Sequence, residues 1–268
     1  MRGLQTPVRA IRRQVFTEVA KLGFKANAET LVADMEAIPY EIVGEDSEVK
    51  YRESIYRARA VVRERLRLAM GLSLRPENKP VHLTAGVEAS NISEKYYEPP
   101  LMQVIPSGCE SCEENKYEVS NMCKGCLAHP CQEVCPRGAI SMVNGKSFID
   151  QDKCIKCGKC KSVCPYDAIA KKERPCKKAC GVNAITSDKL GRAYIDADKC
   201  VSCGMCMVSC PFGAISDKSQ IFQLARALSE GEEIVAEVAP AFVGQFGPNI
   251  NVRNFKAALE ELGFSETY

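Results

Sequence analysis

The chain has 268 residues, enough for one or two compact domains with ordinary hydrophobic cores. Its formal net charge of +2 indicates neither a nucleic acid nor an anionic membrane as the dominant partner. No stretch approaches the roughly 18 apolar residues of a membrane helix, and the feature that stands out is the set of sixteen cysteines.

The cysteine-free residues 1–100 are predicted to be a small helical region. Apolar residues at helical spacing predict one helix from Val8 to Leu22 and another from Ile55 to Ala69, charged on its other face. Between them, Ala28–Ile38 is predicted to be a helix that Pro39 ends. The basic N-terminus lacks the apolar core of an export signal, so we expect a reducing, cytoplasmic location.

Cysteines in a reducing compartment are expected to bind metal rather than form disulfides. Zinc usually takes separated CxxC pairs around one tetrahedral ion. Here "CIKCGKCKSVCP" and "CVSCGMCMVSCP" each contain three cysteines at spacing three and a fourth followed by proline. This is the spacing of bacterial ferredoxins for four-iron clusters. The sequence therefore predicts tandem bacterial-type 2[4Fe-4S] ferredoxin-like units over residues 101–217.

The first unit, about residues 119–170, is predicted to hold two clusters. Three cysteines on a tight loop reach one face of a cubane, and the fourth of the run ligates the other cluster of the pair. His129 lies in the longer first run, but cysteine already supplies every ligand there. The predicted ligands are Cys123, Cys126, Cys131 and Cys164 for cluster 1, and Cys154, Cys157, Cys160 and Cys135 for cluster 2.

An internal repeat predicts a second unit, about residues 167–216. "SFIDQDKC" and "AYIDADKC" correspond, and Cys131 and Cys135 recur 45 residues later as Cys176 and Cys180. The same shift takes Cys123 to Ala168 and Cys126 to Lys171, so two ligands are missing.

The upstream pair in "SGCESCEENK", residues 109–112, has the spacing that the missing ligands need. The predicted ligands are Cys200, Cys203, Cys206 and Cys180 for cluster 3, and Cys109, Cys112, Cys176 and Cys210 for cluster 4. In the alternative interpretation, Cys109 and Cys112 are ordinary thiols or a zinc knuckle, and the second unit has lost a cluster.

Four clusters at about −2 each would change the formal charge of the chain to about −6. Lysines crowd the cysteine loops, and we expect most of them to form a solvated basic face; they are Lys153, Lys156, Lys159, Lys161, Lys177, Lys178 and Lys199.

Residues 218–268 are predicted to be a linker helix over Ser219–Leu228, a strand over Ile234–Ala239 and an amphipathic helix capped near Asn251. Since a lone strand needs sheet neighbours, we expect the start of an incomplete α/β domain. The predicted fold class is α+β: the helical N-terminal region, the tandem ferredoxin-like units, then this first strand and helix.

Several segments together resemble the N-terminal part of monomeric [FeFe] hydrogenases; they are "RGLQTPVRAIRRQVF", "YRESIYRARAVVRERLRLAMGLSLRP", "GCLAHPC", "DKCVSCGMCMVSCPFGAI", "DKSQIFQLARAL" and "VAPAFVGQFGPN". The resemblance implies a ferredoxin-like part that passes electrons to a catalytic domain beginning near "VAPAFVGQFG". No cysteine follows Cys210, so we expect a truncated product or a separate catalytic polypeptide, and no hydrogen production by this chain alone.

Two functions are predicted from these patterns. The first is a low-potential module that relays single electrons between a redox protein such as a ferredoxin and a hydrogenase-type site. The second is a redox-sensing or assembly protein whose N-terminal helices are its interaction part. Rapid reduction by ferredoxin with onward transfer separates the two.

Overall fold

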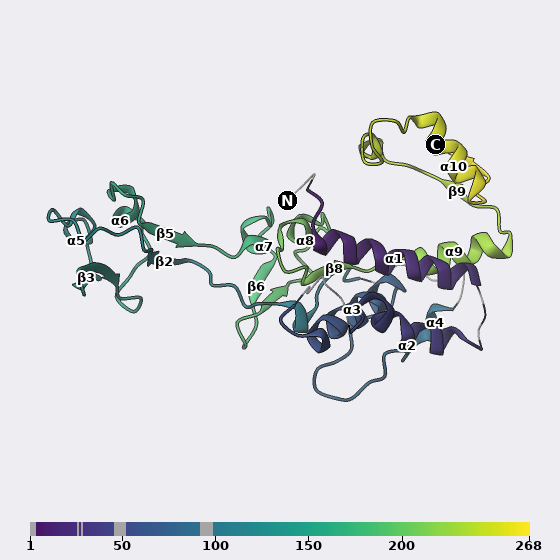
Figure 1. Ribbon diagram of the computed structural model, residues 1–268, viewed down its shortest axis with the longest axis horizontal. Coiled ribbons are helices and arrows are strands. Elements are labelled where there is room, and N and C mark those ends of the chain that lie inside the picture. The colour runs from purple at the N-terminus through teal and green to yellow at the C-terminus, as the bar shows by residue number, and fades with distance from the viewer. Residues whose placement is uncertain (1–3, 26, 28, 46–51, 92–98) are drawn as a thin grey trace. The chain divides into compact units, whose positions relative to one another are not determined.

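The structure is a computed structural model that describes residues 4–25, 27, 29–45, 52–91 and 99–268. The chain forms two compact units. The larger unit contains residues 1–109 and 200–268, and the smaller unit contains residues 110–199. Helices and two-stranded ladders make up the regular structure of the described residues, so the fold mixes helices with small strands (Figure 1). The division into domains at residues 100 and 217 stays a prediction.

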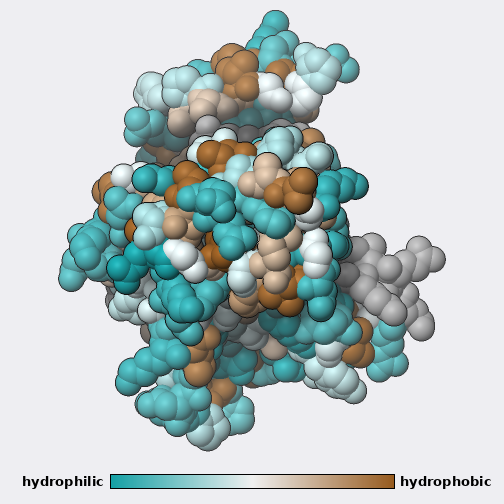
Figure 2. All heavy atoms as spheres, turned by 90° about the vertical axis from the view of Figure 1, so that its left-hand side faces the viewer, coloured by the Kyte–Doolittle hydropathy of each residue, from teal (hydrophilic) through white to brown (hydrophobic). Residues whose placement is uncertain are grey.

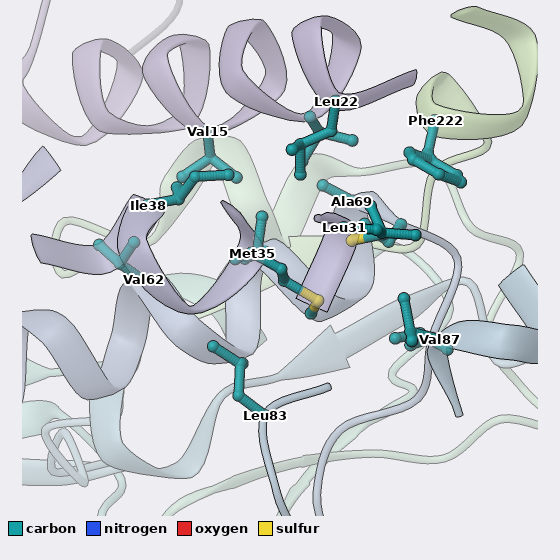
Figure 3. Packing of buried hydrophobic residues seen from close by; sticks show 14 of the residues in the cluster. Val15, Leu22, Leu31, Met35, Ile38, Val62, Ala69, Leu83, Val87 and Phe222 are labelled. Carbon is teal, nitrogen blue, oxygen red and sulfur yellow. The ribbon is translucent and has the colours of Figure 1, made fainter. Parts of the chain in front are cut away.

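Four helices of the larger unit share one hydrophobic core: α1 (Pro7–Lys25), α2 (Leu31–Ile42), α3 (Ile55–Ala69) and α9 (Ile221–Glu230). The predicted stripes of α1 and α3 are confirmed, because Val15, Val19 and Leu66 are fully buried in this core. The short helix α4 (Val87–Ser90) adds Val87, and α9 adds Phe222 (Figure 3). The cysteine-free region and the helix after Cys210 therefore fold together.

Gly23 allows α1 and α9 to approach each other closely. A Cβ atom at this position would lie 2.6 Å from the Ala225 Cβ and 2.7 Å from the Phe222 carbonyl oxygen. Because the second of these atoms is backbone, a side chain here would force the two helices apart.

Pro39 does not end the second helix, so that prediction was wrong. α2 begins at Leu31 and runs through Pro39 to Ile42. Proline removes one backbone hydrogen bond inside a helix. However, the apolar stripe of Leu31, Met35 and Ile38 continues onto buried Pro39, and we attribute the tolerance of this defect to that burial. Ala28, the predicted start, lies outside the described residues.

The charged face of α3 is buried rather than exposed. Arg59, Glu64, Arg65 and Arg67 are all less than a tenth exposed. Arg67 donates to the carbonyl oxygens of Leu83 and Ala85, at 2.6 and 2.8 Å. Buried charged groups need such partners, which here come from segments far away in the sequence. The helix therefore packs against neighbours on both faces.

The cysteine region consists of paired short strands and one-turn helices. β1 (Met102–Val104) pairs antiparallel with β8 (Ile215–Asp217), and β2 (Lys116–Val119) pairs antiparallel with β5 (Ile169–Lys172). Two hairpins lie between these strands in the sequence, namely β3 (Ile140–Val143) with β4 (Lys146–Ile149), and β6 (Ile185–Ser187) with β7 (Ala193–Ile195). The one-turn helices are α5 (Pro130–Glu133), α6 (Lys159–Ser162), α7 (Pro175–Lys178) and α8 (Met205–Ser209), and a 3-10 turn, η1 (Pro106–Gly108), precedes Cys109.

The C-terminal segment is a small β-α-β element. The predicted strand is shorter than expected, β9 (Val235–Ala236), and is followed by η2 (Pro240–Phe242) and α10 (Val252–Glu261). The predicted cap is confirmed, because the Asn251 side chain accepts a hydrogen bond of 2.9 Å from the Asn254 N–H. A second strand that the sequence did not predict, β10 (Glu266–Thr267), pairs parallel with β9.

Candidate iron–sulfur cluster sites

The same backbone turn follows each of the four cysteines that close a cysteine run. In each turn the residue three positions later has a positive φ, and the N–H of the following alanine donates to the cysteine sulfur at 3.3–3.4 Å. The positive-φ residues are Gly138 (58°), Asp167 (46°), Asn183 (52°) and Gly213 (60°). The donor–sulfur pairs are Ala139 to Cys135, Ala168 to Cys164, Ala184 to Cys180 and Ala214 to Cys210.

These turns explain the residue types in the repeated motif. Glycine, asparagine and aspartate are the residues that enter the left-handed region most readily. The four alanines are buried, so a larger side chain has no room at that position. The incomplete run from Cys176 to Cys180 thus carries the same turn as the complete runs. In the sequence this turn appears as a recurring Gly, Asp or Asn directly before "AI", which is a weaker signal than the spacing of the cysteines.

The same alanines hold the segments that lead into the CxxC loops. The carbonyl oxygen of each alanine accepts a hydrogen bond from the backbone N–H of the residue directly after the strand that precedes a CxxC pair. The pairs are Ile105 to Ala214 at 2.7 Å, Ser120 to Ala168 at 2.7 Å, Asp150 to Ala139 at 2.8 Å and Asp196 to Ala184 at 2.8 Å. The segment before Cys109 is therefore tied to the Cys210 turn in the way that the segment before Cys123 is tied to the Cys164 turn.

All four CxxC loops have the same backbone conformation at one position. The residue before the second cysteine has a positive φ in each loop: Ser111 (46°), Gly125 (58°), Lys156 (60°) and Ser202 (55°). The loop from Cys109 to Cys112 thus matches the loops of the complete runs, a correspondence that favours a ligand role for this pair over that of ordinary thiols.

The third cysteine of each run is the second residue of a one-turn helix, and all four are buried. They are Cys131, Cys160, Cys176 and Cys206. The fourth cysteine follows each of them by four residues, about one helical turn later.

Two cavities of the smaller unit are each lined by four cysteines. The first has about 350 Å³ of empty space, including its open mouth, and is lined by Cys135, Cys154, Cys157 and Cys160. The second has about 330 Å³ and is lined by Cys123, Cys126, Cys131 and Cys164. These sets correspond to the predicted ligands of clusters 2 and 1. His129 is not among the described residues that line the second cavity.

The cavities fit iron–sulfur cubanes in donor chemistry. Four thiols with apolar walls, such as Ile140 and Ile149 in the first cavity, form the environment in which such clusters are held. Within the described residues, no three side chains of the metal-binding types meet around a point that could hold one ion. None of the sixteen cysteines forms a disulfide.

Ser147 is a polar contact of the second cavity that the sequence did not reveal. Its N–H donates to the Cys123 sulfur at 3.5 Å, and its hydroxyl lies 3.3 Å from the Cys131 sulfur. The N–H groups of Ser147 and Gly125 lower the pKa of Cys123. A serine in a strand carries no distinctive spacing, so only the folded structure shows this role.

Burial acts in the opposite direction on two other thiols. It raises the pKa of Cys160, and it raises the pKa of Cys206 to about 11. Because clusters are bound by thiolates, these two groups must release a proton when a cluster enters the site.

Arg174 connects the Cys112 loop with the α7 helix that carries Cys176. Its Nε and Nη2 donate to the Cys112 carbonyl oxygen at 3.1 and 3.0 Å, and Nη2 also donates to the Gly191 carbonyl oxygen at 2.7 Å. Arg174 is 4% exposed and was not singled out from the sequence. Cys112, Cys176 and Cys180 belong to the smaller unit, and the other predicted ligands of clusters 3 and 4 belong to the larger unit. The ligand sets of these two clusters therefore stay predictions.

Several lysines near the cysteine loops pair with carboxylates at the surface. Lys153, Lys177, Lys178 and Lys199 lie 2.7–3.5 Å from Asp150, Glu114, Glu173 and Asp196 respectively. Figure 2 views the molecule from the left-hand side of Figure 1, and hydrophilic residues predominate on that face. The side chains of these four lysines are 42–69% exposed, so they match the expected solvated face.

The repeated turns and the cysteine-lined cavities define tandem ferredoxin-like repeats in this part of the chain. A family model described as a 4Fe-4S binding domain matches residues 148–170 and 193–216. The chain therefore carries multiple [4Fe-4S] clusters. Within the described residues, no helix has the length and apolar character needed to cross a bilayer.

Curated relatives match part of the chain. Two uncharacterized ferredoxins of Methanocaldococcus jannaschii are 37% identical over 65 residues and 32% identical over 99 residues, which cover 24% and 30% of this chain. The electron transport protein HydN of Escherichia coli strain K12 is 41% identical over 56 residues, or 21% of this chain. The matches span 39%, 63% and 32% of the lengths of these relatives.

Proposed function

We propose that the chain is an iron–sulfur electron-transfer module that relays single electrons through four [4Fe-4S] clusters. The observation that carries this proposal is the fourfold repetition of one cysteine turn, including the run that lacks its own CxxC pair. The names of the relatives, which include ferredoxins and an electron transport protein, support the same class of function.

The ligands proposed for the four clusters are those predicted from the sequence. Clusters 1 and 2 are supported by the two cavities, each of which four cysteines line. Cluster 4 is supported by two separate contacts: Ile105 to Ala214 ties the approach to Cys109 to the Cys210 turn, and Arg174 ties Cys112 to the start of α7. Cluster 3 is supported by Asp196 to Ala184, which ties the approach to Cys200 to the Cys180 turn.

A bound [4Fe-4S] cluster supplies reversible one-electron chemistry. The protein contributes thiolates from distant segments, apolar walls and N–H groups that point at sulfur. An N–H···S hydrogen bond stabilises negative charge on the sulfur, so the alanine donors favour the reduced state and raise the potential. We expect reduction potentials of about −400 mV, as in ferredoxins.

We propose a redox protein such as a ferredoxin as one partner and a hydrogenase-type catalytic domain as the other. The support is the resemblance of residues 2–16, 51–76 and 238–249 to monomeric [FeFe] hydrogenases. The parallel pairing of β9 with β10 around α10 is also what the start of an α/β domain requires. In this proposal hydrogen chemistry belongs to that domain or to a separate polypeptide, and this chain supplies electrons.

Iron and acid-labile sulfide analysis of anaerobically purified protein tests the cluster count. We expect about sixteen irons per chain, and about twelve would refute the four-cluster proposal. Stopped-flow mixing with reduced ferredoxin then tests whether the chain relays electrons. Rapid reduction with onward transfer to an artificial acceptor supports a relay, whereas slow reduction with no onward transfer would indicate a sensing protein.

A further inference from the structure

One of the two cysteine-lined cavities in the smaller unit opens to the surface through an exposed cysteine. It is the site proposed for cluster 2, and every residue that lines it belongs to the smaller unit. Cys157 is exposed, and its neighbour Ile155, which also lines this cavity, is 57% exposed. By contrast, none of the four cysteines that line the other cavity is exposed. Of these two sites, an external redox protein therefore has easier access to that of cluster 2.

Four exposed cations accompany this opening, and we call them the cationic rim. Two of them line the cavity and two adjoin its cysteines in the sequence; they are Arg137 and Lys159, and Lys156 and Lys161. Among the described residues that line the cavity, none is acidic. None of the ion pairs found between described residues includes a member of the rim. The nearby Lys153, by contrast, pairs with Asp150 at 3.5 Å.

The internal repeat shows that the loop itself does not require these charges. Cys135 corresponds to Cys180, and the run that begins at Cys154 corresponds to the run that begins at Cys200. In the second copy the four rim positions hold neutral residues: Val182 for Arg137, Ser202 for Lys156, Met205 for Lys159 and Met207 for Lys161. Both loops nevertheless have the same conformation, because Lys156 and Ser202 have φ values of 60° and 55°, and α6 and α8 each begin after a glycine in the left-handed region.

The charge of a bound cluster does not require the rim either. An oxidised four-iron core with its four thiolates carries about −2 wherever it is bound. Clusters 2 and 3 would therefore need the same compensation, but only the run of cluster 2 carries the four cations. Exposure alone does not distinguish the two runs, since Cys203 is exposed as well. The positive charge is thus the feature that sets the opening of cluster 2 apart.

We propose that the cationic rim, together with exposed Ile155, is the docking site of an electron-donating redox protein that carries acidic side chains around its own cofactor. The inference rests on the proposed relay function and goes beyond it by naming cluster 2 as the point of entry. One electron passes from the donor's cofactor, which is oxidised, to cluster 2, which is reduced, and no bond forms or breaks.

Charge and composition both suit such a partner. Complementary charge around two redox centres accelerates their association by about 10- to 1000-fold, and this acceleration falls steeply with ionic strength. An apolar side chain accompanied by exposed charged ones is also the usual composition of a protein interface, in which an apolar core is surrounded by a polar rim. Ile155 and the cationic rim provide these two parts on one short segment and the neighbouring Cys135 turn.

The test is the rate constant for reduction of the fully loaded, oxidised protein by a reduced acidic bacterial ferredoxin, measured by stopped flow at several salt concentrations. The triple variant Lys156→Ser, Lys159→Met and Lys161→Met carries the residues of the second run, where the same loop forms. At low salt its rate constant should be at least about tenfold below that of the wild type. At about 1 M salt, where the Debye length is about 3 Å, the two rate constants should agree within about twofold.

A second triple variant, Lys172→Ser, Lys178→Met and Lys189→Met, is the matched control. It removes the same charge from the same unit, but these lysines neither line the cavity nor adjoin one of its cysteines. Its rate constant should stay within about threefold of the wild type at low salt. Iron analysis accompanies every sample. If the first triple variant does not retain the iron of the wild type, Lys156→Ser alone replaces it and should lower the rate constant at least about threefold.

The outcomes separate docking from other effects. A decrease that the control lacks and that high salt removes supports the proposal. An unchanged rate constant, an equal decrease in the control, or a decrease that persists at high salt overturns it; the last would indicate a changed potential of cluster 2. Binding of a short RNA, or self-association in sedimentation, that the triple variant loses while its ferredoxin rate is unchanged would also overturn it.

The proposed function fails in a different way. If reduced ferredoxin does not reduce even the wild type at any salt concentration, the relay function is refuted and the docking proposal falls with it. If the wild type is reduced rapidly and the triple variant equally so, only the docking site is refuted.

Discussion

An alanine at position 125 should prevent the loop of Cys123 and Cys126 from reaching its native conformation. A Cβ at Gly125 would lie 2.0 Å from the Gly145 carbonyl oxygen and 3.1 Å from its carbonyl carbon. Both atoms are backbone atoms in the turn between β3 and β4, so no side-chain rotation relieves the overlap. The equivalent loop positions hold Ser111, Lys156 and Ser202, so positive φ alone does not demand glycine here.

Gly138→Ala is a control with the same backbone angle. Both glycines have a φ of 58°, but a Cβ at Gly138 would have open space around it. A side chain in the left-handed region costs about 1–2 kcal/mol, and both variants carry this strain. Gly125→Ala adds overpacking of about 1–3 kcal/mol. The difference corresponds to a roughly 5- to 140-fold smaller population of the cluster-binding loop.

The assay is iron and sulfide content after anaerobic reconstitution, together with the rate of cluster loss to a chelator in mild denaturant. Gly125→Ala should lose about four irons, or release them at least 5-fold faster than Gly138→Ala. Equal loading and equal release rates in the two variants would refute the reasoning, since only the contact with Gly145 distinguishes them.

Four further predictions rest on three residues, Cys176, Cys206 and Asn251. Cys176→Ala should lower the iron content from about sixteen to about twelve per chain, and a loss of all iron from the second unit would show that its clusters do not bind independently. Cluster uptake by the metal-free protein should rise with pH, because burial raises the pKa of Cys206 to about 11 and each thiol must lose its proton first. In the same metal-free protein, stability should fall as pH rises from about 9 toward 11, because the thiol ionises first in the unfolded chain; denaturant titrations at several pH values check the sign. Asn251→Ala removes the cap on the Asn254 N–H and should destabilise the C-terminal segment by about 0.5–2 kcal/mol, measurable as faster amide exchange in α10 than in α3.

Local chemistry made the cofactor predictable from the sequence. A cubane needs thiolates at fixed spacing on short loops, so "CIKCGKCKSVCP" and "CVSCGMCMVSCP" reveal the clusters without any knowledge of the packing. The helices α1, α3 and α10 were predictable for a similar reason, since their apolar periodicity and the Asn251 cap are local signals.

Features that depend on contacts between distant parts of the chain became evident only in the tertiary structure. The charged face of α3 is buried because carbonyl oxygens from other segments accept its guanidinium groups, as Leu83 and Ala85 do for Arg67. β10 is too short to show a pattern of its own, and it exists because β9 offers a free edge to pair with. Arg174 and Ser147 contact cysteine segments through positions without distinctive spacing. Their roles arise only when the folded chain brings backbone carbonyls and sulfur atoms within hydrogen-bonding distance, because a hydrogen bond depends on proximity in space and not in sequence.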